Sequence, residues 1–212
     1  MSEKNYWSEF YSTTNITEKP SSFASFVNDF IQDKDYKSLL DVGCGNGRDS
    51  RFFAKDMKVV GIDQAESAVV KNNKLSGNQD KYICGDFTSS TFLKSLDLFD
   101  ILYSRFTLHS VEKEDSSTFL KTSAELLFNN GLLCIEVRSV NSDMYGKGEP
   151  DPNGDPDAWI NGHYRRFVRI NELELELKEI GYNTLYIEEQ SGWAKYKGDD
   201  PVLIRVIARI TK

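Results

Sequence analysis

The sequence predicts an α/β fold built around a mostly parallel β-sheet. Short apolar runs alternate with amphipathic stretches along the chain, the order expected of strands and helices that cross over one sheet. A glycine-rich turn follows the first strand-like apolar run. The length of 212 residues suits one domain with a full core, and no internal repeat is visible. We therefore expect a single domain over residues 1–212.

Seven segments have the apolar character of strands. We expect a seven-stranded sheet whose last strand runs antiparallel to its neighbours. The segments are Ser38–Val42, Lys58–Asp63, Lys81–Cys84, Phe99–Tyr103, Leu132–Arg138, Thr184–Glu189 and Leu203–Ile210.

Helices are expected between these strands. In the third, Leu120, Ala124 and Leu127 share a face, and residues 129–131 (Asn-Asn-Gly) are expected to end it. In the last, Asn171 followed by Glu174 resembles a capping box, and Gly181 ends the helix. The expected spans are Asp49–Lys55, Gln64–Lys74, Asp115–Phe128 and residues 171–180.

Two segments lie outside this alternation. Residues 1–37 form an aromatic-rich N-terminal arm, with a helix expected after Pro20. Asn141–Gly162 contains three of the five prolines and five acidic residues against one lysine. Because long loops in compact domains are usually lids, binding loops or disordered segments, we interpret this acidic insertion as a lid.

Composition excludes several classes of protein. The net charge is −7, from 26 basic and 33 acidic residues, which disfavours a nucleic acid polymer as partner. No apolar run approaches the roughly 20 residues of a membrane helix, and the N-terminus lacks the apolar region of a signal peptide. The three cysteines form no CxxC motif, which is typical of reduced thiols. We expect a cytoplasmic monomer or homodimer that makes no membrane contact.

The strongest functional signal is the glycine turn. Its sequence is Leu39-Leu-Asp-Val-Gly-Cys-Gly-Asn-Gly-Arg-Asp-Ser50. Glycines let the backbone turn sharply and let a ligand approach without a Cβ in the way. In open α/β sheets ligands bind at the carboxyl ends of the strands, where this turn lies.

Two acidic residues narrow the choice of ligand. Asp63 ends the second strand, where an acid binds ribose hydroxyls in dinucleotide-type folds. A nicotinamide dinucleotide fold also needs a third glycine at the position that Arg48 occupies. Asp41, directly before the turn, would repel a pyrophosphate and suits an amine. This combination indicates S-adenosylmethionine, which carries an amine, a sulfonium and a ribose but no phosphate.

The chain resembles the class I S-adenosylmethionine-dependent methyltransferases. The resemblance rests on Asp41-Val-Gly-Cys-Gly-Asn-Gly47, on Asp63 and on Cys84-Gly-Asp-Phe87, and it covers residues 38–212. It implies a Rossmann-like three-layer sandwich.

The resemblance also implies roles for single residues in cofactor binding. Gly43 and Gly45 would approach the cofactor, and Asp63 would bind its ribose. Asp86 would meet the adenine amine, although it could equally be a turn-forming residue. The remaining implied cofactor contacts are Tyr6, Trp7, Tyr11, Asp41, Asn46, Arg48, Gln64, Phe87, Ser104 and Arg105. The three arm residues Tyr6, Trp7 and Tyr11 could instead only pack the arm on the core.

The acceptor side contains the only two histidines. His109 follows the fourth strand, and His163 follows the acidic insertion. Both are candidate proton acceptors, and both could instead be structural. Arginines nearby favour an anionic acceptor, unless they merely tether the acidic insertion. The candidate acceptor-binding residues are Arg105, Arg138, His163, Tyr164, Arg165 and Arg166.

Metal binding and thiol chemistry are not indicated. Alternate acids from Asp151 resemble an EF-hand, but Pro156 and Gly162 occupy the places of its glycine and glutamate, so we expect no metal. Cys44 has no base nearby in the sequence, which favours a small spacer.

The sequence therefore predicts an S-adenosylmethionine-dependent methyltransferase for a small anionic acceptor, with oxygen favoured over nitrogen as the methylated atom. A weak similarity of residues 162–167 and 191–201 to bacterial methyltransferases of surface-polysaccharide and nucleotide-sugar pathways suggests one setting. Two alternatives remain, an NAD-linked oxidoreductase and a non-catalytic cofactor-binding subunit.

Overall fold

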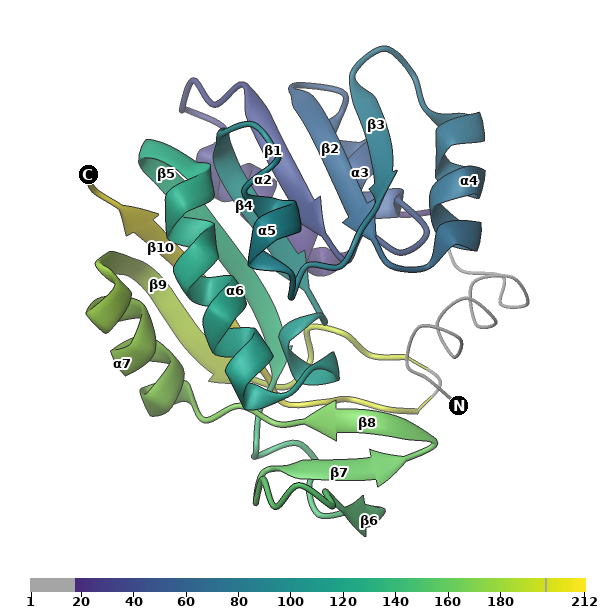
Figure 1. Cartoon of the computed structure of the whole chain (residues 1–212), viewed down its shortest axis with the longest axis vertical. Helices are drawn as coiled ribbons and strands as arrows, with labels where there is room; N and C mark the ends of the chain where they lie inside the picture. Colours follow the sequence, from purple (N-terminus) through teal and green to yellow (C-terminus); the bar gives the residue numbers. More distant parts are fainter. Residues whose placement is uncertain (1–17, 197) are drawn as a thin grey trace.

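The structure is a computed structural model, and it describes residues 18–196 and 198–212. One seven-stranded sheet forms the middle layer, with helices on both faces (Figure 1). Its order is β3-β2-β1-β4-β5-β10-β9, and β10 runs antiparallel to the other six strands. This confirms the predicted three-layer α/β sandwich and its antiparallel last strand. No helix among the described residues is long and apolar enough to cross a membrane.

The sheet strands agree closely with the predicted segments. Three of them, β1, β2 and β10, have the predicted bounds. The strands are β1 (Ser38–Val42), β2 (Lys58–Asp63), β3 (Asp80–Cys84), β4 (Phe99–Arg105), β5 (Leu127–Arg138), β9 (Tyr182–Gln190) and β10 (Leu203–Ile210).

Alternation along β1, β4 and β5 divides the core between the two faces. Leu39, Ile101 and Leu132 are paired across these strands, and they pack in one cluster with α2 (Ser22–Ile31) and Phe53 of α3 (Arg48–Phe53). Their neighbours Leu40, Leu102 and Leu133 lie in the other cluster. Both faces of these parallel strands are therefore buried, which explains their continuous apolar sequence.

The second cluster is covered by helices from the middle of the chain. Phe119 and Leu120 of α6 (Lys113–Leu126), Leu173 and Leu177 of α7 (Ile170–Ile180) and Leu93 of α5 (Ser90–Leu93) pack there. The helix α4 (Glu66–Leu75) instead packs through Val69 against Tyr82 at the β3 edge.

Two predicted helix ends are wrong. The helix α6 ends at Leu126, and residues 129–131 belong to β5, where Asn130 has φ 66° and the register shifts. The helix α7 begins at Ile170 with Arg169 as N-cap and no side-chain cap, so Asn171 and Glu174 form no capping box. Gly181 ends this helix as predicted, with φ 107°.

The acidic insertion is not an irregular loop. With the residues that follow, it forms a second sheet of β6 (Glu149–Pro150), β7 (Ala158–Asn161) and β8 (His163–Arg166). Figure 1 shows this small sheet below the carboxyl ends of β4 and β5, and β8 contacts the 3-10 helix η1 (Leu108–Ser110). The insertion therefore lies at the edge of the sheet where a ligand is expected.

Candidate active site

The glycine turn lies where the strand order of the sheet reverses. The chain runs outward from β1 to β2 and β3 and then returns to β4 on the other side of β1. The turn follows β1, and Gly43, Gly45 and Gly47 all have positive φ, between 53° and 71°. Other residues adopt this backbone conformation at a cost, so the sequence needs glycine at these places. Such a switch point is the expected ligand crevice of an open α/β sheet.

Asp63 fastens the second strand to this turn. Its carboxylate accepts hydrogen bonds from the backbone N–H of Gly45 and of Ala65, each at 2.8 Å. Burial raises the pKa of Asp63, and hydrogen bonds from the backbone of Ala65, Gly45 and Gln64 oppose the rise. A carboxylate has about four lone-pair sites, so it can also accept from a ribose hydroxyl.

Asp41 lies beneath the turn with 3% of its surface exposed. Burial raises its pKa to about 7, and Asp49 and Asp63 add to the rise. Its carboxylate accepts a hydrogen bond from Ser50 Oγ at 2.5 Å. Such a group would be stabilised as an anion by a cationic partner. The amine of S-adenosylmethionine fits this requirement, and its ribose fits Asp63.

The other predicted cofactor residues lie around the same edge. Arg48 is half-buried, with Nε 3.8 Å from the carboxylate of Asp49. Asp86 is exposed, and its Oδ1 accepts from the backbone and hydroxyl of Thr88, so it does form a turn. The half-buried residues are Asn46 and Gln64, and the buried ones are Phe87 and Ser104. Tyr6, Trp7 and Tyr11 lie outside the described residues.

The end of β4 connects the turn with the acceptor side. Phe106 follows β4 with φ 60°, which is uncommon for a residue with a large side chain. The Thr107 methyl group occupies the space that a Cβ on Gly43 would need, 2.0 Å away. Backbone strain such as that at Phe106 clusters at functional sites.

Both histidines and three of the predicted arginines come together beside Phe106. The guanidinium groups of Arg105 and Arg138 lie over the Phe106 ring, 4.1 and 5.8 Å from its centroid. His109 is buried, with its ring 5.3 Å from that of Phe106. His163 and Arg165 of β8 complete the group, which we call the His–Arg cluster.

Both histidines of the His–Arg cluster are neutral at pH 7. Burial, followed by repulsion from Arg138 and Arg165, lowers the pKa of His109 well below its usual range. Burial and the same two arginines lower the pKa of His163 to about 4. Neutral imidazole can accept a proton, so the cluster can serve both predicted roles, anion binding and proton transfer.

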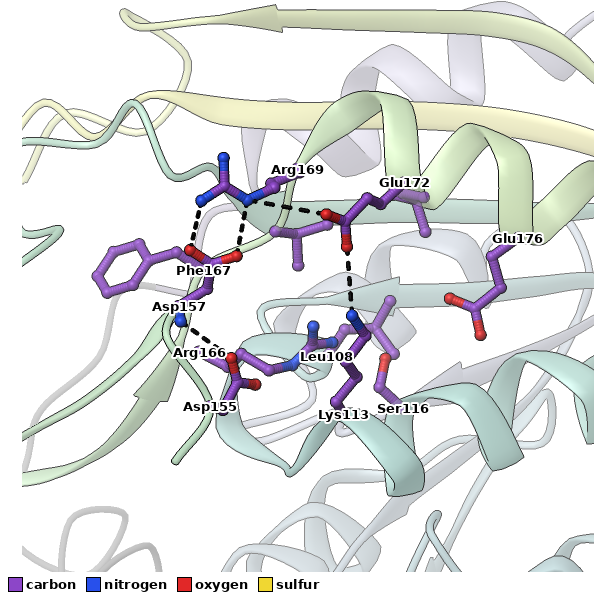
Figure 2. A pocket seen from close by; sticks show the side chains of 12 residues that line it. Leu108, Lys113, Ser116, Asp155, Asp157, Arg166, Phe167, Arg169, Glu172 and Glu176 are labelled. Atoms are coloured by element: carbon purple, nitrogen blue, oxygen red, sulfur yellow. Dashed lines mark hydrogen bonds and ion pairs between the residues drawn. The ribbon is translucent and has the colours of Figure 1, made fainter. Parts of the chain in front are cut away.

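The strand β8 separates four of the predicted acceptor-binding residues. Successive side chains of a strand point to opposite faces, so His163 and Arg165 join the His–Arg cluster while Tyr164 and Arg166 face the other way. Among the nearest charges to Tyr164 are Asp155 and Asp151. Arg166 lines a separate pocket with Lys113 and Asp155 (Figure 2).

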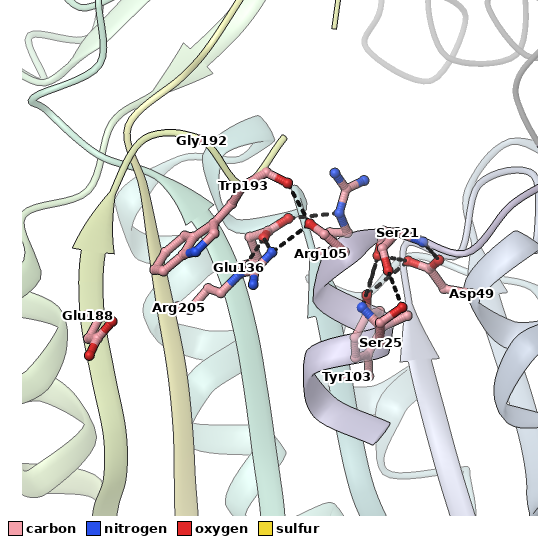
Figure 3. Close-up of polar contacts among 12 residues, drawn as sticks. Ser21, Ser25, Asp49, Tyr103, Arg105, Glu136, Glu188, Gly192, Trp193 and Arg205 are labelled. Carbon is pink, nitrogen blue, oxygen red and sulfur yellow. Dashed lines mark hydrogen bonds and ion pairs between the residues drawn. The ribbon is translucent and has the colours of Figure 1, made fainter. Parts of the chain in front are cut away.

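Sequence reasoning missed the group that holds Arg105. Glu136 accepts from Arg105 through one oxygen and from Arg205 through the other, each at 2.7 Å (Figure 3). Arg205 in turn lies 4.4 Å from the ring centroid of Trp193. A signal was present, because Glu136 and Arg205 each stand between two apolar residues of a strand. A contact of Arg105 with cofactor or acceptor stays a prediction.

Comparisons with known proteins agree with this geometry. Residues 40–135 match a family model described as a methyltransferase domain. None of the curated proteins matches the chain in sequence.

Solved structures share the fold at low sequence identity. One is the 1,6-didemethyltoxoflavin-N1-methyltransferase of Burkholderia thailandensis, with 1,6-didemethyltoxoflavin and S-adenosylhomocysteine bound. It is 18% identical, with 98% of this chain and 86% of that chain covered and a TM-score of 0.72.

Two further structures are methyltransferases dependent on S-adenosylmethionine. That of Anabaena variabilis is 15% identical, covers 98% of this chain and 93% of its own, and has a TM-score of 0.72. That of Methanosarcina mazei is 16% identical, covers 86% and 97%, and has a TM-score of 0.71. With the family match over residues 40–135, they show that the chain has the fold of the S-adenosylmethionine-dependent methyltransferases, and the geometry of the glycine turn agrees with that cofactor.

Proposed function

We propose that the chain is a class I S-adenosylmethionine-dependent methyltransferase that acts on a small acceptor carrying a carboxylate or a phosphate. The observation that supports this is the His–Arg cluster beside the end of β4. Arg138 offers a buried guanidinium nitrogen, Nη1, that has no hydrogen-bond partner among the described residues. Arginine suits carboxylate and phosphate because its N–H groups form a planar fork.

The proposed acceptor atom is oxygen rather than nitrogen. A hydroxyl must lose its proton as its oxygen bonds to the methyl carbon, whereas a neutral amine already has a lone pair for that bond. His109 is neutral, and its Nδ1 has no hydrogen-bond partner among the described residues, so it can take the proton. S-adenosylmethionine, when bound, supplies the methyl group on a sulfonium.

Positioning supplies the rest of the proposed mechanism. Gly43, Gly45, Asp41 and Asp63 would hold the cofactor at one side of Thr107, and the His–Arg cluster would hold the acceptor at the other. Holding two reactants in line converts an encounter in solution into a step within one complex. His163 and Arg165 of β8, which directly follows the acidic insertion, would contribute to the acceptor side, whereas Tyr164 and Arg166 face away from it. We propose that the insertion acts as a lid.

The proposed setting follows from the acceptor chemistry. Acidic sugars and sugar phosphates carry both the hydroxyl and the anion, which accords with a role in surface-polysaccharide biosynthesis. We place the reaction in the cytoplasm, with the enzyme as a monomer or homodimer and no nucleic acid polymer as substrate.

Calorimetry tests the cofactor site. We expect S-adenosylhomocysteine to bind the wild-type chain, and Asp63→Ala to weaken binding about 100-fold or more, because the ribose loses its acceptor and the glycine turn loses its anchor. Asp80→Ala is a matched control. Asp80 is also a buried carboxylate with two hydrogen bonds, from Gly77 N and Tyr82 Oη, but it lies at the other end of β3. No binding to the wild type, or equal losses in both variants, would contradict the assignment.

A substrate screen tests the acceptor class. Radiolabelled methyl transfer should occur to hydroxylated acids or sugar phosphates and not to their uncharged counterparts. Transfer to uncharged acceptors alone would contradict the proposal while leaving the cofactor site intact.

A further inference from the structure

The two histidines of the His–Arg cluster are not equivalent. His163 Nε2 lies 3.0 Å from Nη2 of Arg165. A guanidinium group has donors only, so Nε2 of His163 must be the acceptor of this hydrogen bond. His163 is therefore neutral, with its proton on Nδ1. In this arrangement its basic lone pair orients Arg165 and does not point to a substrate proton.

His109 differs because its Nδ1 is buried and makes no hydrogen bond among the described residues. Buried polar atoms without partners are rare in folded proteins and call for an explanation. The charged groups around His109 are Arg105 from β4, Arg138 from β5 and Arg165 from β8, together with His163. Glu136 balances Arg105, and Asp199 balances Arg138 through Nη2 at 3.0 Å.

Arg138 has the same kind of unused atom. Its Nη2 donates to Asp199, but its Nη1 is buried without a hydrogen-bond partner in the described part of the chain. One acid therefore holds the guanidinium in place while a second donor remains available. Arg138 and Arg165 are also the two arginines that most strongly disfavour protonation of His109.

We propose that Arg138 and Arg165 bind the oxyanion of the acceptor, that His163 positions Arg165 for this contact, and that His109 gains its proton affinity only when the oxyanion is bound. This inference rests on the proposed function for the identity of the acceptor. An anion between the two guanidinium groups offsets the repulsion that they exert on protonated His109. A unit charge about 5 Å away, at an effective dielectric constant of about 20, shifts a titration midpoint by about two pH units.

The consequence is a base that becomes active with its own substrate. Without a bound anion, His109 is neutral and has a low affinity for an additional proton. With the anion bound, His109 becomes a stronger base at the moment when a hydroxyl must be deprotonated. In the transfer step the acceptor O–H bond breaks, its proton moves to His109 Nδ1, and the oxygen forms its bond to the methyl carbon as the carbon–sulfur bond breaks.

The test uses the fact that the chain has only two histidines. An NMR spectrum of the imidazole Cε1–H groups therefore contains two signals, which His109→Gln and His163→Gln assign. The full chain with S-adenosylhomocysteine bound is titrated with acid in chloride, in inorganic phosphate and in acetate at one ionic strength. We expect the midpoint of the His109 signal to rise by about 1–2 pH units in phosphate or acetate relative to chloride. The anion with the larger shift indicates the anionic group of the acceptor.

Variants separate this site from unspecific effects of the anion. Arg138→Gln should abolish the shift and leave the affinity for S-adenosylhomocysteine unchanged. Arg209→Gln is the matched control, because Arg209 of β10 pairs with Leu132 of β5, away from Arg138 and the cluster, and it should leave the shift unchanged. His163→Gln retains an acceptor for Arg165 and should keep phosphate binding, whereas His163→Leu should weaken it about tenfold, as expected when a hydrogen bond to a charged group is lost.

Three results would overturn the inference. They are a His109 midpoint that is the same in all three salts, a shift that survives Arg138→Gln, and equal phosphate affinities in the two His163 variants. Because S-adenosylhomocysteine binding is measured in the same samples, failure of the anion site is distinguishable from failure of the cofactor site.

Discussion

Asp41 lies beneath the glycine turn, and burial raises its pKa to about 7. The unfolded chain releases this proton near pH 4, while the folded chain retains it up to about pH 7. The contribution of Asp41 to the free energy of unfolding therefore falls as the pH rises from about 4 to 7. Above that range the carboxylate is a cost to the fold, which a bound amine would offset.

Replacing this carboxylate should separate stability from binding. We expect Asp41→Asn, without cofactor, to raise the free energy of unfolding at pH 8 by about 4 kcal/mol, since the pKa of Asp41 rises from about 4 to about 7 and each pKa unit corresponds to about 1.4 kcal/mol. The same variant should bind S-adenosylhomocysteine more weakly. Urea denaturation at pH 5 and pH 8, with and without the ligand, measures both effects. A variant less stable than wild type at pH 8, with unchanged affinity, would show that Asp41 serves the fold alone.

At the scale of elements, an ion pair attaches the segment that forms β6, β7 and β8 to the main domain. Arg169 donates to both oxygens of Asp157, at 2.8 and 2.7 Å, directly before α7. Glu172 of α7 reaches Lys113 of α6 at 3.3 Å, as Figure 2 shows. Burial opposes ionisation of Asp157, but hydrogen bonds from Arg169 and Tyr145 prevail and lower its pKa.

Loosening this attachment should mobilise the proposed lid. We expect Arg169→Ala to speed amide hydrogen exchange over residues 141–162 about fivefold, the effect of roughly 1 kcal/mol for a partly exposed pair. Because the pKa of Asp157 is lowered, the wild type should lose the same protection as the pH falls below about 4. Lys94→Ala, which removes an exposed pair with Glu125, is the control. Unchanged exchange in Arg169→Ala would mean that other contacts hold the lid.

A second exchange measurement tests the lid itself. Binding of S-adenosylhomocysteine and inorganic phosphate together should slow exchange over residues 141–162, because a closed lid exposes fewer amides to solvent. The two ligands added singly serve as controls. If the pair has no effect on this segment, the lid assignment is wrong.

The same elements show what sequence could and could not predict. The strands β1, β2 and β10 were predicted to the residue, because a strand buried on both faces must be apolar throughout. The small sheet was missed because its strands are two to four residues long and depend on distant partners. Tyr145, for example, packs against Trp159 and Phe167. A segment of this kind has no periodicity of its own to read.

The candidate site also has one part that the sequence could predict and one part that it could not. The cofactor side was predictable because it lies on one short motif and on strand ends that follow it. On the acceptor side, the separation of Arg165 from Arg166 required knowing that residues 163–166 form a strand. The partnership of Glu136 with Arg205 required the pairing of β5 with β10, 69 residues apart.

At the scale of the whole molecule, Glu136 joins distant parts of the chain. It is buried and paired with Arg105 of β4 and Arg205 of β10. Arg205 also donates to Ser22 Oγ of α2, and Ser22 donates to the Trp193 carbonyl between β9 and β10. Through Glu136 and its two arginines, polar contacts therefore connect the central sheet with α2 and with the segment between β9 and β10 (Figure 3).

Removing the acid should destabilise the whole domain. We expect Glu136→Gln to lower the free energy of unfolding by about 3–5 kcal/mol, because Arg205 then remains buried without its counter-charge. Glu125→Gln, in an exposed pair, should change it by less than about 1 kcal/mol. Urea denaturation of both variants gives the comparison. A small effect in Glu136→Gln would show that hydrogen bonds from neutral partners suffice to hold Arg205.

The contact between Gly43 and Thr107 limits how this enzyme could be redesigned. The Thr107 methyl group fills the space beside the glycine turn, so the cofactor side and the acceptor side share one wall. Grafting a new β7–β8 hairpin would change acceptor selectivity and leave that wall intact. Grafting the residues between β4 and η1 would alter both sides at once. Engineered libraries should therefore vary residues 158–166 and retain Thr107.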